Sequence, residues 1–550
     1  MMNNSNGSHR NPFDNGIRMI VILVIGFEVI FIIAKMLGFE MAIFPIMGLL
    51  IIAVPGGVYL LGQLATKFVI AGIVNFRNRD STGIVLGETS GWPSVSIFLE
   101  EDEREGHMAI LGRTGSGKST HMKAMIDQDI VNSKPLVLID PHTSVAHHTV
   151  DRCVLLNRIP VLLEPDTEFM NTLNLLETGP SYGPSDAAKT VMEGIVQAYL
   201  AYEHEIPTKI KHLLETAVYL LSAVDDGYTL LELRRWMIQP QFRNDVAVKV
   251  AEKSESSRWL EASHALGNLE WYNSLTAFQK HDQMQSSWTR VAAFLDHPDI
   301  RKMLGCSKST FDFEQVRNGR PLVVSISDRT VHRDSKVVNA VILTWITQKL
   351  LEGSMDIWSA RPISLFVDEL AEISPESFER VLLHGRKCGV HLTCIVQAQT
   401  MLDHRLFRTV MANMSNLVIF ASSGPGVEAL SREIIRPLDA ESKEGAVNSY
   451  MELNRQIHAM ASRIRDLRKH EFLNWNAHRP GPPLHCKTPE VRWNPFEVVK
   501  MSRAHALRQV GRPVRDIEEE IRERTEDLDA RYGRLHSFGG PERSDFLAPW

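Results

Sequence analysis

Residues 107–120 read HMAILGRTGSGKST, an apolar run followed by a glycine-rich segment. The apolar run, 108–111, predicts a buried strand that runs into the spacing Gly-x-x-x-x-Gly-Lys-Ser. In a P-loop, glycines at these positions let backbone amides surround phosphate oxygens at the N-terminus of a helix. Apolar residues at helical spacing follow the motif, so the sequence predicts an α/β domain that binds a nucleotide.

Each position of the motif has an expected role. Lys118 is expected to reach the terminal phosphates of the nucleotide, and the Ser119 hydroxyl is expected to bind Mg²⁺. The residues predicted to surround the phosphates are Gly112, Arg113, Thr114, Gly115, Ser116, Gly117, Lys118, Ser119 and Thr120.

A second apolar strand supplies the acids that such a site needs. Residues 362–372 read PISLFVDELAE, and Ile363, Leu365, Phe366 and Val367 form the short apolar run of a strand buried on both faces. Asp368 at its end is predicted to hold Mg²⁺, and Glu369 is predicted to orient or deprotonate the attacking water. The adjacent acids, together with the lack of an NKxD motif that would read guanine, favour an ATPase over a GTPase.

A long helical segment separates the two motifs. About 250 residues lie between them, far more than a doubly wound core needs between its first and middle strands. From about residue 185 the apolar spacing becomes helical. We therefore predict an all-helical insertion, 181–315, between two parts of the nucleotide-binding core, 76–180 and 316–495. Further core strands are predicted at 136–140, 160–164, 322–327, 392–396 and 417–420.

The first 75 residues are predicted to be a membrane anchor. Residues 19–34 and 41–61 are apolar and close to the length that a helix needs to cross a bilayer, although Glu28 lies within the first. A second span directly after the first argues against a cleaved signal peptide. Lys and Arg residues flank the pair, which by the positive-inside rule places both ends in the cytoplasm. The expected result is a two-pass hairpin in a bacterial inner membrane.

The composition limits the kinds of partner. Sixty Lys and Arg against sixty-six Asp and Glu give the 550-residue chain a net charge of −6, which excludes a protein that coats nucleic acid through bulk positive charge. The five cysteines are scattered, without the spacing of a disulfide scaffold or a zinc site. His142, His147 and His148 have no acid or cysteine at ligand spacing, so they are expected to face solvent or to support the site from behind.

Residues 496–550 are predicted to form a charged helical tail. Between 515 and 535 charges of both signs recur at i, i+4 spacing, which is typical of an exposed helix. A solvated helix is therefore the default interpretation, and a docking surface for substrates is the alternative. The residues from 537 onward are expected to be disordered.

Taken together, five stretches resemble the coupling proteins of conjugative type IV secretion systems, which are membrane-anchored motor ATPases of the FtsK/HerA class. The stretches are GRTGSGKST, VLIDPH, LFVDEL, GRKCGVHLTCIVQAQTMLD at 385–403 and ANMSNLVIF at 412–420. The resemblance covers roughly residues 15–490 and implies a RecA-like P-loop core with an inserted helical domain. Two features depart from the family: Thr143-Ser144 stands where a Gly-Asp pair is usual, and the turn between the two spans is short.

The resemblance also implies roles for individual residues. Lys118, Ser119, Asp368 and Glu369 match the family's P-loop and acidic positions. Arg386 matches a residue suspected of acting in trans on a neighbouring subunit's γ-phosphate, and Gln397 matches a sensor that links nucleotide state to motion. Gln399 competes with Gln397 for the sensor role, and a surface ion pair is the simpler interpretation of Arg386.

The function implied is an ATP- and Mg²⁺-dependent motor that assembles as a ring, with a hexamer expected. Such a motor would recruit a relaxase or accessory proteins and move DNA through its central channel to a type IV secretion channel. One alternative is a coupling ATPase that acts as a receptor for protein effectors. Another is an FtsK-type chromosome translocase, which the lack of a four-span anchor and of a winged-helix module disfavours.

Overall fold

The structure is a computed structural model of the 550-residue chain. It describes residues 83–91, 94–179, 182–200, 206–253, 259–327, 335–352, 361–369, 375–397, 404–424, 426–435, 446–479 and 481–535. The predicted membrane hairpin lies outside these ranges. Within them, none of the helices combines the length and the apolar composition that crossing a bilayer requires. The architecture below is that of the compact unit formed by residues 81–90 and 96–550.

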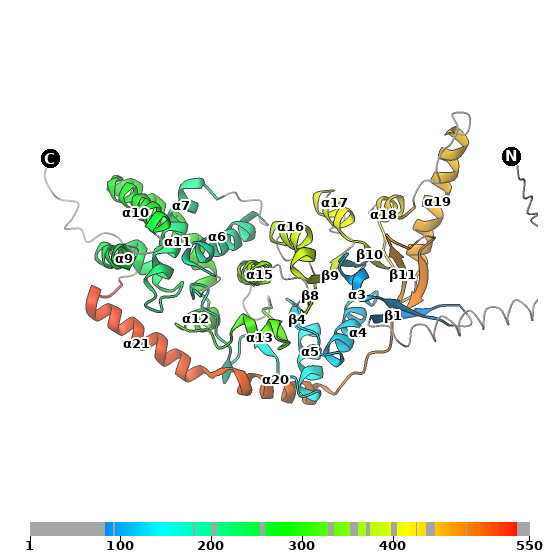
Figure 1. Ribbon diagram of the computed structural model, residues 1–550, viewed down its shortest axis with the longest axis horizontal. Helices are drawn as coiled ribbons and strands as arrows, with labels where there is room; N and C mark the ends of the chain where they lie inside the picture. Colours follow the sequence, from blue (N-terminus) through cyan, green and yellow to red (C-terminus); the bar gives the residue numbers. More distant parts are fainter. Residues whose placement is uncertain are drawn as a thin grey trace, which may run out of the picture. The chain divides into compact units, whose positions relative to one another are not determined.

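The centre of this unit is a large mixed sheet, visible edge-on between its helices in Figure 1. Within the described residues it has the strand order β2-β1-β12-β11-β10-β3-β9-β8-β4-β7-β5. The strands from β10 to β5 all run parallel to their neighbours. They are β10 (Asn416–Phe420), β3 (Met108–Gly112), β9 (Val390–Gln397), β8 (Ile363–Val367), β4 (Leu136–Ile139), β7 (Leu322–Val324) and β5 (Val161–Leu163).

Every core strand predicted from the sequence is found among these parallel strands. Strands such as LVLI in β4 and ISLFV in β8 are buried along their whole length. Parallel strands are covered by helices on both faces, so a short unbroken apolar run is the pattern that this environment requires. The α/β P-loop fold class is therefore confirmed for the described core.

An antiparallel extension of the sheet was not predicted. It consists of β1 (Ile84–Thr89), β2 (Ser96–Leu99), β11 (Glu471–Asn476) and β12 (Leu484–Lys487). These strands mix polar and apolar residues, as in EFLNWN and LHCK. One face of an antiparallel sheet can be exposed to water, so the sequences of these strands lack the continuous apolar run of the parallel strands.

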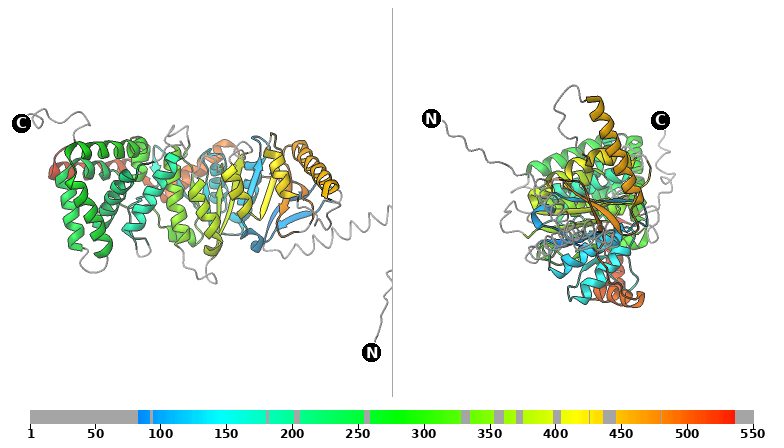
Figure 2. Two further views of the ribbon diagram at one scale, coloured as in Figure 1. Left: turned by 90° about the horizontal axis from the view of Figure 1, so that it is seen from above. Right: turned by 90° about the vertical axis from the view of Figure 1, so that its right-hand side faces the viewer.

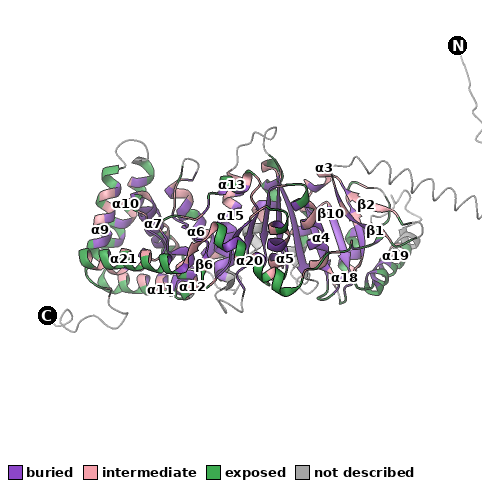
Figure 3. Ribbon diagram, turned by 90° about the horizontal axis from the view of Figure 1, so that it is seen from below, coloured by how far each residue is buried: buried purple, intermediate pink, exposed green. Residues whose placement is uncertain are grey.

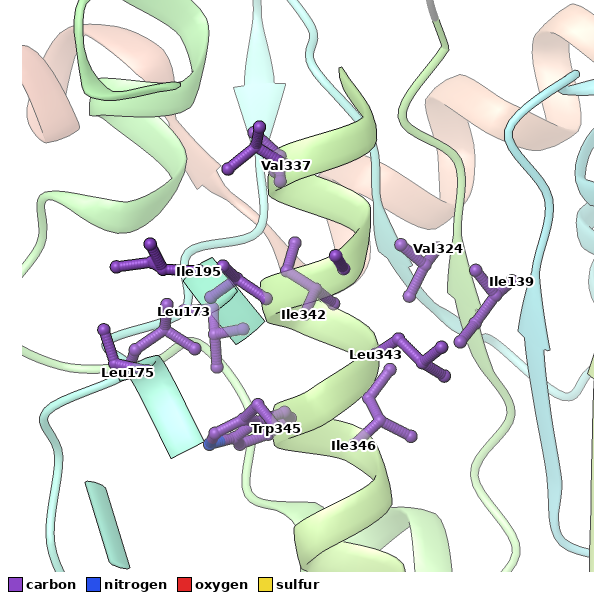
Figure 4. Packing of buried hydrophobic residues seen from close by; sticks show 14 of the residues in the cluster. Ile139, Leu173, Leu175, Ile195, Val324, Val337, Ile342, Leu343, Trp345 and Ile346 are labelled. Atoms are coloured by element: carbon purple, nitrogen blue, oxygen red, sulfur yellow. The ribbon is translucent and has the colours of Figure 1, made fainter. Parts of the chain in front are cut away.

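Helices cover both faces of the parallel strands. On one face, α4 (Lys118–Val131), α5 (Ser144–Leu155) and α20 (Phe496–Val510) share a core with strand residues such as Ile110 and Leu138. On the other face lies α15 (Ser335–Leu351), whose Leu343 and Ile346 point toward Ile139 and Val324 in Figure 4.

The chain between β6 (Phe169–Met170) and β7 is helical (Figure 2). Its helices are α6 (Pro184–Leu200), α7 (Thr208–Val224), α8 (Glu232–Ile238), α9 (Pro240–Lys253), α10 (Trp259–Ser274), α11 (Ala277–Leu295), α12 (Pro298–Leu304) and α13 (Phe313–Arg317). The apolar residues at the helical spacing predicted from about residue 185 onward are buried, for example Val191 and Ile195 on α6 and Leu214 and Leu221 on α7. Their core is continuous with that of the sheet through α15, so the exact limits of the insertion stay a prediction.

The C-terminal helix α21 (Val514–Tyr532) corrects the prediction of a solvated tail. It is helical and mostly exposed on its outer side (Figure 3), but Val514, Ile517 and Leu528 are buried. Its charged residues also pair with the helical segment: the Arg524 Nε donates to Glu232 Oε1 over 3.0 Å, and Asp529 pairs with the buried Arg235. Charge spacing along one helix cannot show partners that come from elsewhere in the chain, which is why the sequence predicted a helix surrounded by solvent.

Glu232→Ala is expected to lower the free energy of unfolding by about 3 kcal/mol, because it removes one partner of a largely buried ion pair. The Glu232 carboxylate also accepts from the backbone N–H of Thr229 over 2.7 Å, so the turn that precedes α8 loses a buried hydrogen bond as well. Urea unfolding of the full chain measures the effect. Glu519→Ala, which breaks an exposed pair with Arg522 on the same helix, should change stability by less than about 0.5 kcal/mol. Equal effects of the two variants would show that the Glu232–Arg524 contact does not hold α21.

Candidate nucleotide-binding site

The loop between β3 and α4 has the backbone that a phosphate-binding loop requires. Gly115 and Gly117 have φ values of 77° and 117°, in the left-handed region that favours glycine. A Cβ on Gly117 would also lie 2.8 Å from the Nδ1 of His470. The glycine spacing therefore serves both the conformation of the loop and the close approach of a neighbouring segment.

Lys118 lies at the start of α4 and folds over the loop. Its Nζ donates to the carbonyl oxygens of Gly112 over 2.9 Å and Arg113 over 3.0 Å. The side chain is buried, and this burial lowers the pKa of the ammonium, while the charges of Glu369 and Asp368 act in the opposite direction. The ammonium is thus held between the loop and the acidic pair, where terminal phosphates would lie.

Strands β4 and β8 end side by side, and each is followed by a buried aspartate. Ile139 and Val367 are partners in the β4–β8 register, so Asp140 and Asp368 follow side by side. Burial, and then the charge of Asp140, raise the pKa of Asp368 to about 7. Such a pair of carboxylates is stabilised in its ionised form by a cation. Mg²⁺ characteristically binds one or two carboxylates together with substrate phosphates and water, so the Asp368 carboxylate and the Ser119 hydroxyl fit this ion.

Glu369 follows Asp368 with φ of 64°, a left-handed conformation that a non-glycine residue rarely adopts. Its Oε2 lies 2.7 Å from the Nε2 of His142, in the loop after β4. The structure thus places Lys118, Asp368 and Glu369, predicted from motifs far apart in the sequence, at one edge of the sheet.

The backbone places Gln397 beside the P-loop. It is the last residue of β9 and pairs in register with Gly112 of β3. Because β9 lies between β3 and β8, this position is between the phosphate-binding loop and the acidic pair. Gln399, the competing sensor residue, lies outside the described residues.

Arg386 lies at the opposite edge of the sheet. It belongs to the short helix η5 (Gly385–Cys388), which precedes β9, and the strand then spans about 23 Å before it reaches the P-loop level. Its side chain is 70% exposed, and its Nε is 3.3 Å from the Glu105 Oε2. The surface ion pair considered from the sequence is therefore present, and Arg386 cannot reach the P-loop of its own chain.

The three histidines considered earlier each contact a different acid. His142 pairs with Glu369, His147 with Glu164 over 2.9 Å and His148 with Asp127 over 2.9 Å. Within the part of the chain that the structure describes, no group of three His, Cys, Asp or Glu side chains could hold a metal ion by itself.

Sequence reasoning missed the segment that packs against the outside of the P-loop. This segment joins α19 (Ala446–Asp466) to β11, and the His470 backbone N–H donates to the carbonyl of Ser116 over 2.9 Å. It comes from about 350 residues further along the chain and carries no recognisable motif, so nothing in the sequence could have indicated the contact. Beneath the loop, burial lowers the pKa of His121 to about 3, and its neutral ring packs edge-on against Phe420 and Phe472.

Comparison with known proteins agrees with this geometry. Residues 84–206 match the family described as the central domain of the helicase HerA. The plasmid coupling protein TrwB in complex with ADP and Mg²⁺ superposes with a TM-score of 0.52 at 15% identity, covering 78% of this chain and 94% of that one. The chain shares its fold with a conjugative coupling protein. The resemblance predicted from the five stretches is thereby confirmed at the level of the fold.

Two further TrwB structures superpose similarly. An unbound form of TrwBdeltaN70 has a TM-score of 0.51 at 15% identity and covers 77% of this chain and 92% of that one. The complex with the non-hydrolysable ATP analogue ADPNP has a TM-score of 0.50 at 14% identity, with the same coverage. A search of curated proteins found no match.

Proposed function

We propose that this protein is a membrane-anchored ATPase that couples a DNA substrate to a type IV secretion channel in conjugative transfer. One observation carries the proposal: Lys118, Asp368 and Glu369 meet at one sheet edge, in a fold shared with TrwB. The TrwB complexes with ADP and Mg²⁺ and with an ATP analogue support the same ligands here.

The chemistry follows from the positions of these side chains. Lys118 binds the terminal phosphates, and Asp368 and Ser119 would hold Mg²⁺, which neutralises phosphate charge when bound. Glu369 orients a water whose oxygen bonds to the γ-phosphorus while the bond from that phosphorus to the β,γ-bridging oxygen breaks. The proton of the water passes to the Glu369 carboxylate, and ADP and phosphate leave.

Assembly into a ring, with six subunits expected, would complete each site. Arg386 is exposed and lies at the edge opposite its own P-loop, so a neighbouring copy in a head-to-tail ring is the partner that it could serve. We place DNA in the central channel of the ring and the predicted hairpin, 1–75, in the inner membrane. Gln397, between the P-loop and the acids, would report nucleotide state, and a relaxase or accessory protein would deliver the DNA.

The test is the ATPase rate of the purified full chain with and without single-stranded and duplex DNA, across a salt series. Stimulation that weakens as salt rises is expected, because contacts to phosphates release counterions. Basal hydrolysis that ignores both forms of DNA would overturn the DNA motor and favour a receptor for protein effectors.

A further inference from the structure

The loop between β4 and α5 is built to hold one side chain against Glu369. Buried Asp140, at the end of β4, accepts from the backbone N–H groups of His142 over 2.8 Å, Val145 over 2.7 Å and Ala146 over 2.8 Å. Thr143 has a left-handed backbone, with φ of 67°. A residue other than glycine keeps such a conformation only where its surroundings determine it. The loop, and with it His142, is therefore fixed from beneath.

From this loop the His142 ring reaches the acid at the end of β8. The Nε2 to Oε2 distance of 2.7 Å is that of a short hydrogen bond in which an imidazole N–H donates to a carboxylate. The Glu369 side chain is only 14% exposed, whereas that of His142 is 48% exposed. Solvent thus competes weakly for the carboxylate.

We propose that His142 is a positioning residue for Glu369: it holds one carboxylate oxygen and so fixes the direction in which the other acts on the attacking water. This inference rests on the proposed function, because Glu369 has a role only if a nucleotide is hydrolysed. A glutamate side chain has several rotamers, and ordering it costs conformational entropy. Because the loop already holds His142 in place, Glu369 is ordered by folding, and its conformational entropy is lost before the reaction begins.

Two other charged side chains near Glu369 among the described residues, Lys118 and Asp368, do not make an equivalent contact. The Lys118 ammonium attracts Glu369, but it is bonded to two loop carbonyls and is needed for the phosphates. Asp368 bears the same charge as Glu369 and repels it. His142 therefore gives Glu369 a hydrogen bond of fixed direction, and the proposed reaction does not need the His142 N–H for any other step.

One departure from the family pattern lies in the same loop. The sequence Asp140-Pro141-His142-Thr143-Ser144 lacks the usual Gly-Asp pair. In this chain the backbone of the loop is held by the hydrogen bonds to Asp140 and by the left-handed conformation of Thr143. The residue before Thr143 is His142, whose ring contacts Glu369.

The test compares steady-state ATP hydrolysis by the full chain carrying His142→Ala, His142→Gln or His147→Ala. His142→Ala is expected to lower kcat by about 10- to 100-fold, with KM for ATP and the affinity for a fluorescent ADP analogue unchanged. His142→Gln keeps an N–H donor and should recover most of the rate. His147→Ala removes a matched histidine–glutamate pair, with Glu164, and should behave like the wild type.

Two results would overturn the inference while the proposed function stands. One is a wild-type kcat in His142→Ala, in a chain whose hydrolysis still requires Lys118. The other is an equal loss of kcat in His142→Gln and His142→Ala at unchanged thermal stability. A wild-type chain that hydrolyses no ATP would instead refute the proposed function, and the inference with it.

Discussion

Lys118→Ala is expected to reduce ATP hydrolysis by about 1,000-fold or more, to the background of the assay. The Lys118 ammonium lies over the P-loop, bonded to the carbonyls of Gly112 and Arg113, and faces Asp368 and Glu369. Alanine has no group that could bind the terminal phosphates or offset the charge that develops on them. Phosphate release by the purified full chain at saturating ATP measures the loss.

The control for this variant is Lys134→Ala. Lys134 precedes β4, at the edge of the sheet opposite the P-loop, and pairs with Glu101. Its removal should leave the hydrolysis rate unchanged within about twofold, because Lys134 lies at the opposite end of the parallel strands and cannot contact the nucleotide. Hydrolysis at the wild-type rate by a folded Lys118→Ala chain would refute the assignment of the site.

The parallel core of the fold could be predicted because burial leaves a strong mark on the sequence. Strands β3, β4 and β8 are buried along their length and mostly apolar, and each ends at the edge where the site forms. The antiparallel edge gave no comparable signal, since β11 and β12 mix polar with apolar residues and are only partly buried. Their positions depend on pairing with distant strands, which short-range patterns do not encode.

The same distinction explains the tail helix α21. The sequence indicated a helix, and the structure has one, because i, i+4 charge spacing is a local property. Its contacts with Glu232, Arg235 and Ser307 join residues more than 200 positions apart, and no local pattern reveals them.

The positions of candidate site residues could be predicted where the chemistry fixes the residue type and its place at a strand end. Lys118 and the acids Asp368 and Glu369 belong to this group. His142 was expected only to face solvent or to support the site, because a histidine in a loop has many uses. Its contact with Glu369 depends on the β4–β8 register, which brings the two loops together.

Arg386 shows how the position of a residue in the fold limits the role that a sequence motif implies for it. It was assigned from the resemblance, and η5 puts it before β9, at the edge away from the P-loop. An arginine there can stabilise transition-state charge only in a neighbouring subunit. The role therefore requires a site shared between two copies, and this requirement has a distinctive experimental signature.

Arg386→Ala is expected to lower kcat by about 1,000-fold, and mixing it with Glu369→Gln chains should restore part of the activity. Where an Arg386→Ala chain binds ATP and a Glu369→Gln chain is its neighbour, the interface has an intact Glu369 and an intact Arg386. Hydrolysis is measured on rings reassembled from the two variants, which carry different tags so that mixed rings can be purified.

The matched controls use Lys118→Ala. Mixed with Arg386→Ala, it should also restore activity, because its Arg386 is intact and its neighbour has a complete P-loop. Mixed with Glu369→Gln, it should restore nothing, since both lesions affect the subunit that binds ATP and no interface is complete. If tagged mixed rings of Arg386→Ala and Glu369→Gln form and stay inactive, Arg386 does not act on a neighbour. Its exposed pair with Glu105 is then its whole role, because the length of β9 excludes action on its own nucleotide.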